Sequence, residues 1–296
     1  MGEAMSEVGS GHIDWDALSD AELDALERQI AGKYMHQVPW GAVAWGLTNL
    51  TVWLALWPLV MLDLLPLWIA FPLATLNIML CYLPSHEAQH SIIARKGHPL
   101  RWLNELVGHL SVLPFQPFRV LRYTHFEHHL HTNDPSLDPD YGVHAASDFD
   151  FLKNSLLRRQ PGAKNTAYAE ALQRTGMEHL LLDAVIHNSF YVLVLFGMAW
   201  SGHAIEVALL WWLPRHLAVT YVQYYLSWAP HHPGKAQGRY RETRGFKSAL
   251  GNLLSMGMQY HIIHHLYPRI PLSKTPAAFR ELRPILVRKG CDLGDL

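Results

Sequence analysis

Residues 65–90 read LPLWIAFPLATLNIMLCYLPSHEAQH, an apolar run that leads directly into His86 and His90. Its apolar part, residues 65–84, has the length of about 20 residues that an α-helix needs to cross a bilayer. The two histidines are spaced i and i+4, so on a helix they project from one face. This stretch therefore predicts a membrane helix with potential transition-metal ligands at its end.

Three other apolar stretches of similar length cover residues 39–60, 179–200 and 204–227. The links within the first pair and within the last pair are only a few residues long, so each pair is expected to form a helical hairpin. Apart from Arg215, every lysine and arginine lies in residues 1–38, 85–178 or 228–296. By the positive-inside rule, these three segments share the cytoplasmic face.

We therefore expect an all-α integral membrane protein with four transmembrane helices in two hairpins and a cytoplasmic helical cap. Residues 1–38 are expected to form a cytoplasmic N-terminal segment, and residues 39–296 one membrane domain. We expect both termini to be cytoplasmic, on a bacterial inner membrane. A capping box at residues 19–22, followed by Leu23, Leu26 and Ile30, predicts an amphipathic helix at the membrane interface that ends at Gly32.

The composition agrees with a membrane protein and narrows the metal chemistry. Only 17% of the residues are charged, whereas soluble domains average about 25%. The formal net charge of -1 argues against a nucleic-acid partner. The two cysteines, Cys81 and Cys291, are far apart in sequence and form no CxxC pair, so any metal should be held by nitrogen and oxygen.

Histidines recur in two further clusters with helical spacing, HFEHH at residues 125–129 and HIIHH at residues 261–265. Together with residues 86–90 they supply eight imidazoles, which is more than one ion can use, so a two-metal site is indicated. A single zinc ion would leave most of these imidazoles without a metal to bind. A metal transporter or sensor is the alternative from another class, but its ligands should lie across the spans rather than outside them on one face.

In this order, and separated by paired apolar stretches, HEAQH, HFEHH and HIIHH resemble the three histidine boxes of the membrane fatty acid desaturase and hydroxylase superfamily, which includes carotenoid hydroxylases. Residues 132–135 and 138–140, TNDP and DPD, also resemble the stretch after the second box in bacterial desaturases and carotenoid hydroxylases. The resemblance implies a non-haem centre of two iron ions on the cytoplasmic side, with O2 as co-substrate and a lipid as substrate.

The resemblance also implies a further ligand about thirty residues before the third box, in an Asn-x-x-x-His element. Here Ser227 replaces the asparagine and His231 is the candidate, with His232 as the neighbouring alternative. The expected metal ligands are then His86, His90, His125, His128, His129, His231, His261, His264 and His265.

Acidic residues near the boxes could orient the imidazole rings. They are Glu87, Glu127, Asp134, Asp138 and Asp140, of which the last three also fit a solvated turn. Inside the apolar stretches, Asp183 and Arg215 could form an ion pair between helices, or could serve the site or the substrate.

The boxes do not choose between desaturation and hydroxylation. We expect a fatty acyl lipid as substrate, with a carotenoid ring hydroxylase or ketolase as the alternative. The chain shows no flavin, nucleotide or iron–sulfur motif, so electrons are expected from an external donor of the ferredoxin or cytochrome b5 type, with its reductase. A basic run could dock an acidic donor or bind anionic lipid; it contains Lys235, Arg239, Arg241, Arg244 and Lys247.

Overall fold

The computed structural model describes residues 14–160, 162–163, 165–253 and 255–296, and over this part of the chain it is all-helical, with one isolated β-bridge between Arg244 and Asp292. The first 13 residues of the expected N-terminal segment lie outside the described residues. The α-helices are α1 (Asp20–Tyr34), α2 (Trp40–Met61), α3 (Leu67–Leu80), α4 (Tyr82–Gln89), α5 (Arg101–Val112), α6 (Phe118–His131), α7 (Asp148–Leu157), α8 (Ala167–Arg174), α9 (Leu181–Trp200), α10 (Ala204–Val207), α11 (Leu213–Val222), α12 (Ala229–His231), α13 (His261–Leu266) and α14 (Thr275–Arg288). Short 3-10 turns are η1 (Tyr141–Val143), η2 (Glu178–Leu180), η5 (Met258–Tyr260) and η6 (Leu272–Lys274), and η3 (Ala208–Trp212) and η4 (Gln223–Trp228) are π-helical.

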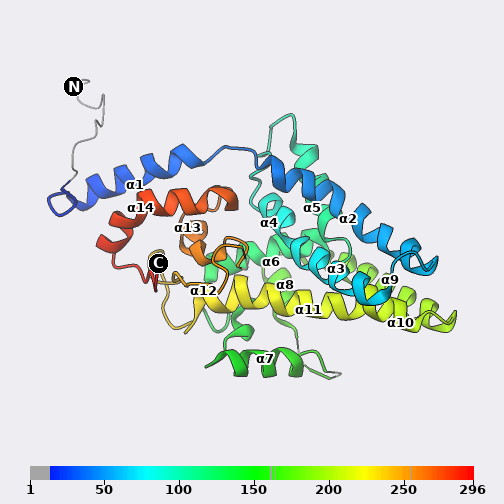
Figure 1. Cartoon of the computed structure of the whole chain (residues 1–296). Helices are drawn as coiled ribbons and strands as arrows, with labels where there is room; N and C mark the ends of the chain where they lie inside the picture. Colours follow the sequence, from blue (N-terminus) through cyan, green and yellow to red (C-terminus); the bar gives the residue numbers. More distant parts are fainter. Residues whose placement is uncertain (1–13, 161, 164, 254) are drawn as a thin grey trace.

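Three helical segments within the described residues are long and apolar enough to cross a membrane: Trp40–Met61, Leu67–Gln89 and Glu178–Trp200. They correspond to the first three apolar stretches. The second segment joins α3 to α4, so the predicted membrane helix does continue into the first histidine box. In Figure 1, α2, α3, α9 and α11 extend together toward the right.

The fourth apolar stretch is helical but is not one regular α-helix. From Ala204 to His231 the backbone stays helical while it passes from α10 through η3, α11 and η4 to α12. Each π segment widens a turn and shifts the rotational register of the side chains that follow. The expected fourth span therefore consists of short pieces, none of which has the length of a span by itself.

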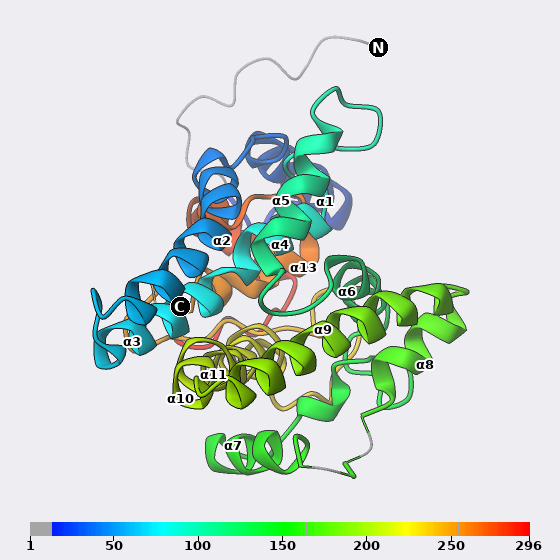
Figure 2. The ribbon, with the colours of Figure 1, turned by 90° about the vertical axis from the view of Figure 1, so that its right-hand side faces the viewer.

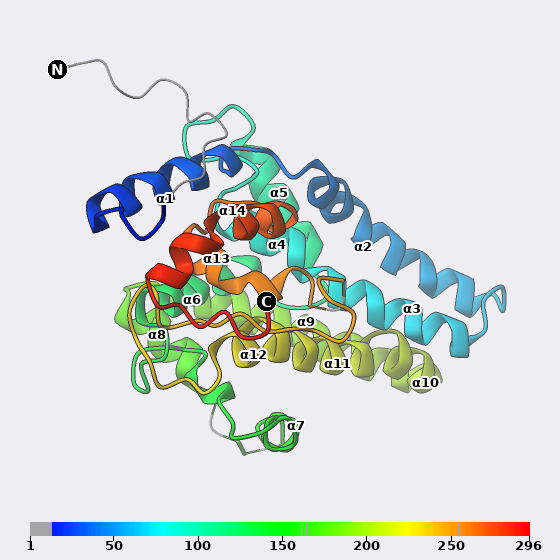
Figure 3. The same cartoon turned by 60° about the vertical axis from the view of Figure 1, so that its left-hand side comes forward.

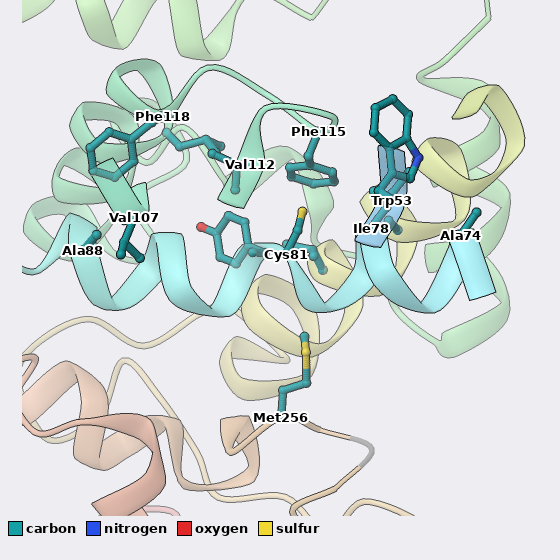
Figure 4. Packing of buried hydrophobic residues seen from close by; sticks show 14 of the residues in the cluster. Trp53, Ala74, Ile78, Cys81, Ala88, Val107, Val112, Phe115, Phe118 and Met256 are labelled. Atoms are coloured by element: carbon teal, nitrogen blue, oxygen red, sulfur yellow. The ribbon is translucent and has the colours of Figure 1, made fainter. Parts of the chain in front are cut away.

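The membrane-type helices pack through small residues and buried hydrogen bonds. Figure 4 shows Ala74, Ile78 and Cys81 packed beneath Trp53 and Phe115. The indole of Trp53 donates to the carbonyl of Leu210 at 3.0 Å, which ties α2 to η3. Such bonds matter between apolar helices because no water is present to satisfy a buried donor.

The N-terminal helix begins at the predicted capping box, but its surroundings differ from those expected. Ser19 accepts from the Glu22 amide at 3.4 Å, and the Glu22 carboxylate accepts from the Ser19 amide at 2.9 Å. The helix runs to Tyr34 rather than ending at Gly32. Its apolar face packs on α13 and α14, where Leu23 and Ile30 are buried, so the expectation that this face lies on the membrane interface was wrong. Figures 1 and 3 show α1, α13 and α14 grouped together, at the opposite end of the molecule from the link between α2 and α3.

The segment between the second and third apolar stretches contributes helices on two sides of the molecule. α5 packs on α2 and α4, whereas α7 is the outermost helix at the lower edge of Figure 2. Two hydrogen bonds hold α7 and the residues after it along the fourth apolar stretch. Tyr224 donates to Asp148 at 2.8 Å, and Arg159 donates to Thr220 at 2.6 Å.

Candidate metal centre

The first two histidine boxes meet because α4 and α6 cross beside each other. His86 and His90 lie near the end of α4, while His125 and His129 are one turn apart on α6. The Nε2 atoms of His90 and His125 are 2.8 Å apart, and those of His125 and His129 are 3.1 Å apart. His264 from α13 completes this group, with its Nε2 2.9 Å from that of His129.

A second group forms from His128 on the same face of α6, from the end of α12 and from α13. Its members are His128, His231, His261 and His265, and their ligand-type nitrogens all lie within 4.8 Å of one another. The Nε2 atoms of His128 and His231 are 3.2 Å apart. The π-helical turn η4 directly precedes α12 and sets the direction in which His231 points.

The structure therefore brings all nine predicted histidines into one cluster of two adjoining groups. His86, His90, His125 and His264 form the first group, with His129 in contact with it. The neighbouring His232 lies outside both groups and packs its ring on Trp228 at 4.9 Å between centroids. Of the two alternatives in the sequence, His231 is the one that the fold places in the cluster.

Burial keeps most of these imidazoles neutral. Desolvation holds the pKa values of His90, His125 and His129 well below the usual range, and lowers that of His231 to about 3. The neutral imidazole is the form that ligates a metal.

His128 is the exception in the cluster. Burial opposes its protonation, but the adjacent Asp138 carboxylate more than compensates and raises the pKa of His128 to about 9. The shift reflects the strength of the contact between this histidine and its acid.

The cluster has the chemistry of a metal site. Both ring nitrogens of His86, Nε2 of His261 and Nε2 of His265 are buried without a hydrogen-bond partner. A buried polar atom without a partner costs about 1–3 kcal/mol, and a bound cation would satisfy several of these atoms together. Neutral nitrogen donors suit iron and other first-row transition ions, so the residues present fit two such ions.

Two acidic residues orient rings in the second group. Asp138 accepts from Nδ1 of His128 at 2.9 Å, which is the orienting role rather than the solvated turn that its sequence also fitted. Glu242 was missed: its carboxylate contacts Nδ1 of His265 at 3.1 Å and its carbonyl accepts from Nδ1 of His231 at 2.9 Å. Glu242 lies within a basic run of sequence, and no local pattern distinguishes it there.

The other candidate acids form their hydrogen bonds and ion pairs with residues outside the nine histidines. Glu87 accepts from the Leu272 amide at 2.8 Å, and Asp134 caps the turn at Ser136. Glu127 pairs with Arg174, and Asp140 accepts from Tyr168 and Ser227. The serine that replaces the expected asparagine is thus bonded to an acid near the site.

The possible ion pair between Asp183 and Arg215 is absent from the described structure. Asp183 instead lies 3.6 Å from Arg119. Arg215 donates to the carbonyl of Phe115 at 2.9 Å and stacks over the ring of Tyr191. Of the two alternatives left open by the sequence, the ion pair is therefore not the one observed, because the partner of each charge depends on which helices are neighbours, and hydropathy does not report this.

A cavity of about 600 Å³ adjoins the histidine cluster. His125 and His128 form part of its wall. Much of the remaining wall is apolar and comes from Tyr82, Phe115, Leu121, Val219, Val222 and Leu226. A long apolar molecule could lie in this space with one of its carbons beside the histidines.

Comparison with known proteins agrees with this geometry. The profile described as fatty acid desaturase matches residues 62–291, which include all three boxes. The chain belongs to the fatty acid desaturase family. Membership in this desaturase family supports an oxidoreductase, and the apolar helices are in keeping with an integral membrane protein.

Curated relatives of this desaturase-family chain act on more than one kind of lipid. The sn-1 oleoyl-lipid 12-desaturase of Synechocystis sp. is 40% identical over 58 residues, 19% of this chain and 15% of the relative. The zeaxanthin 4-ketolase of Chlamydomonas reinhardtii is 37% identical over 62 residues, 20% of this chain and 13% of the relative. A Delta(9) fatty acid conjugase-like enzyme of Dimorphotheca sinuata is 23% identical over 248 residues, 68% of this chain and 64% of the relative.

In each case the match spans less than two thirds of the relative's length. The family and its desaturase- or hydroxylase-type activity are therefore supported at a coarse level, and the particular reaction is not.

Proposed function

We propose that this protein is an O2-dependent membrane oxidoreductase that desaturates or hydroxylates a fatty acyl lipid at a non-haem centre of two iron ions. The observation that carries the proposal is the pair of buried histidine groups beside a cavity whose wall is partly apolar. Family membership supports the same class of chemistry.

In this proposal the nine histidines named above hold the metal. One ion lies with His86, His90, His125, His129 and His264, and the other with His128, His231, His261 and His265. When bound, the iron ions would supply O2-dependent oxidation of an unactivated C–H bond.

The chain's own residues orient the ligands and the substrate. Asp138 and Glu242 hold the Nδ1 atoms of His128 and His265, so that the other nitrogen of each ring is directed toward the metal. The apolar wall at Leu121, Val222 and Leu226 excludes water from the chain that is to be oxidised.

The proposal includes a membrane topology. Residues 39–296 would form one domain with four transmembrane helices in two hairpins, the fourth covering residues 204–227 of the helical run. The histidine cluster and the cap of α1, α13 and α14 would lie on the cytoplasmic side of a bacterial inner membrane, as the distribution of lysine and arginine favours. A C-terminal reporter that is active only in the periplasm should remain silent; an active reporter would reverse the orientation.

The reaction can be tested by expression in a host with a simple lipid profile. Mass spectrometry of total fatty acids and isoprenoids should reveal a new acyl product in the wild type, with about two irons per purified chain. His128→Ala should lose the product and at least one iron. The matched control is His131→Ala, on the same helix but outside both groups, which should keep both. A product that persists in His128→Ala would count decisively against the proposal.

A carotenoid ring hydroxylase or ketolase is the second candidate. It is supported by the local similarity to the zeaxanthin 4-ketolase. Expression in a carotenoid-producing host distinguishes the two, because this activity would change the pigments and leave the fatty acids unaltered.

Electrons would come from an external ferredoxin or cytochrome b5 type donor with its reductase. Lys235, Arg241 and Lys247 are exposed and could contact an acidic donor, whereas Arg239 pairs with Glu27 and Arg244 donates to the Ala229 carbonyl. Reversing the three exposed charges in liposomes of neutral lipid should slow reduction of the metal centre. An unchanged rate would remove this surface as the docking site.

A further inference from the structure

The cavity beside the histidines also contains two arginines. Arg158 and Arg159 follow α7 and line the same space as His125 and His128. A site that binds only an apolar chain needs no cationic side chain. Burying an arginine is costly unless its charge is compensated, so the partners of these two side chains are informative.

Arg159 is held in place by neutral acceptors. Its guanidinium donates to the carbonyl of His216 at 3.1 Å, the hydroxyl of Thr220 at 2.6 Å and the hydroxyl of Ser155 at 2.9 Å. These bonds fix the side chain without neutralising it. Desolvation accordingly lowers its pKa to about 10.

Arg158 keeps part of its donor capacity unused. Nη1 donates to the carbonyl of Gly142, while Nη2 is buried and has no hydrogen-bond partner. Among the described residues, neither Arg158 nor Arg159 has a carboxylate oxygen within 4.0 Å.

Two acids line the cavity, Asp140 and Glu170, and the charge of Asp140 acts on Arg158 from beyond ion-pair distance. Asp140 accepts from Tyr168 at 3.0 Å and from Ser227 at 3.1 Å. Glu170 is exposed. The cavity therefore combines an apolar wall, an end formed by histidines and a cationic part with an unfilled donor.

Arg159 and the histidines lie at different heights along the fourth apolar stretch, whereas Arg158 bonds to Gly142, two residues after Asp140. Arg159 bonds to Thr220, whereas Ser227 lies seven residues further on, beside the acid next to the histidine end. At about 1.5 Å per residue this separation is about 10 Å. A molecule that contacts both Arg159 and the histidines must therefore be elongated.

We propose that Arg158 and Arg159 bind the anionic oxygen head group, a carboxylate or a phosphate, of the acyl lipid whose chain lies in this cavity. Guanidinium groups suit such oxygens because their planar donors can bind two of them at once. The inference rests on the proposed oxidation of an acyl lipid and specifies the chemical class of its head group.

The surroundings of the cavity are compatible with entry from the lipid phase. The side of α7 that faces away from the protein exposes Phe149, Leu152, Leu156 and Leu157. An apolar stripe on a helix that lies beside a membrane-type helix is suited to contact with acyl chains.

Binding can be measured apart from turnover, on the iron-loaded protein in neutral detergent with no electron donor present. The probes are stearate, octadecyl phosphate, stearyl alcohol, inorganic phosphate and a neutral carotenoid. The variants are Arg158→Gln, Arg158→Lys and Lys153→Gln. Lys153 lies on the exposed side of α7 and serves as a matched loss of charge.

Stearate, octadecyl phosphate or both should bind the wild type more tightly than stearyl alcohol or the carotenoid. Which of the two binds better identifies the head group. Arg158→Gln should weaken binding of the anionic lipid about 10- to 100-fold, as expected for a lost charge-assisted hydrogen bond. Arg158→Lys should recover part of that loss, and Lys153→Gln should have no effect.

Several results would overturn the inference. Equal binding of stearyl alcohol and stearate would show that the site does not recognise the negative charge. Inorganic phosphate that binds as well as octadecyl phosphate would show an adventitious ion only. Tighter binding of the carotenoid than of either anionic lipid would contradict it too. Anion-dependent binding by a protein that forms no acyl product would refute the proposed function and leave this site standing.

Discussion

At the scale of single residues, the contact between His128 and Asp138 connects the second box to its surroundings. His128 is buried, and its Nδ1 lies 2.9 Å from Oδ1 of Asp138. The other carboxylate oxygen accepts from the amide of Asn133 at 2.9 Å, which fixes the carboxylate against the end of α6. The acid thereby determines which nitrogen of His128 is available to a metal.

Replacement of Asp138 should therefore weaken metal binding without removing a ligand. Removing such an outer-sphere partner typically costs about 10- to 100-fold in metal affinity, so we expect that loss for Asp138→Ala in a titration with iron(II). Asp138→Asn keeps an acceptor oxygen and should lose less. Asp134→Asn, in the exposed turn nearby, serves as the control and should bind iron like the wild type. Equal affinity in Asp138→Ala and the wild type would refute the orienting role.

At the scale of the elements, patterns of neighbouring residues predicted the local structure well. The capping box at Ser19 starts α1, the apolar stretches become helices, and the histidine spacing places ligands on common faces. Features set by distant parts of the chain were not predictable. Hydropathy does not reveal the π turns at η3 and η4, and an amphipathic pattern does not say whether α1 faces lipid or α14.

The crossing of α2 with α4 and α5 depends on Gly46. A Cβ atom at this position would lie 2.6 Å from Cγ1 of Val107 and 2.8 Å from Cβ of Pro84. Pro84 precedes His86 on α4, so any displacement would move the first box. Gly41, on the same helix, has nothing within 4 Å of such an atom.

We therefore expect Gly46→Ala to destabilise the folded protein by about 1–3 kcal/mol, as overpacking commonly does. Gly41→Ala should be neutral or slightly stabilising because alanine favours a helix more than glycine does. Thermal unfolding of the two variants in the same detergent compares them directly. Similar unfolding midpoints for the two variants would contradict this prediction, because α2 would then move away from α4 and α5 without a loss of stability.

At the scale of the whole molecule, Glu27 joins the N-terminal helix to the segments that carry the second histidine group. It is buried and accepts from Tyr267 at 2.7 Å and from Tyr240 at 2.9 Å. Tyr267 directly follows α13, and Tyr240 lies two residues before Glu242, which contacts His265. The N-terminal helix is thus tied to both sides of this group.

Loss of the Glu27 carboxylate should consequently be felt at the metal centre as well as in the cap. Glu27→Ala leaves the hydroxyls of the buried Tyr267 and the half-buried Tyr240 without their acceptor, at a cost of about 1–3 kcal/mol for the buried group. We expect a lower thermal midpoint and an iron content below two per chain, because the contacts run to the Glu242 segment and to α13, which carries ligands of both groups. Gln29→Ala, on the exposed side of the same helix, should change neither quantity. If Glu27→Ala lowers the midpoint but retains both irons, the helix stabilises the cap independently of the histidines; if it lowers neither, α1 is dispensable to this part of the fold.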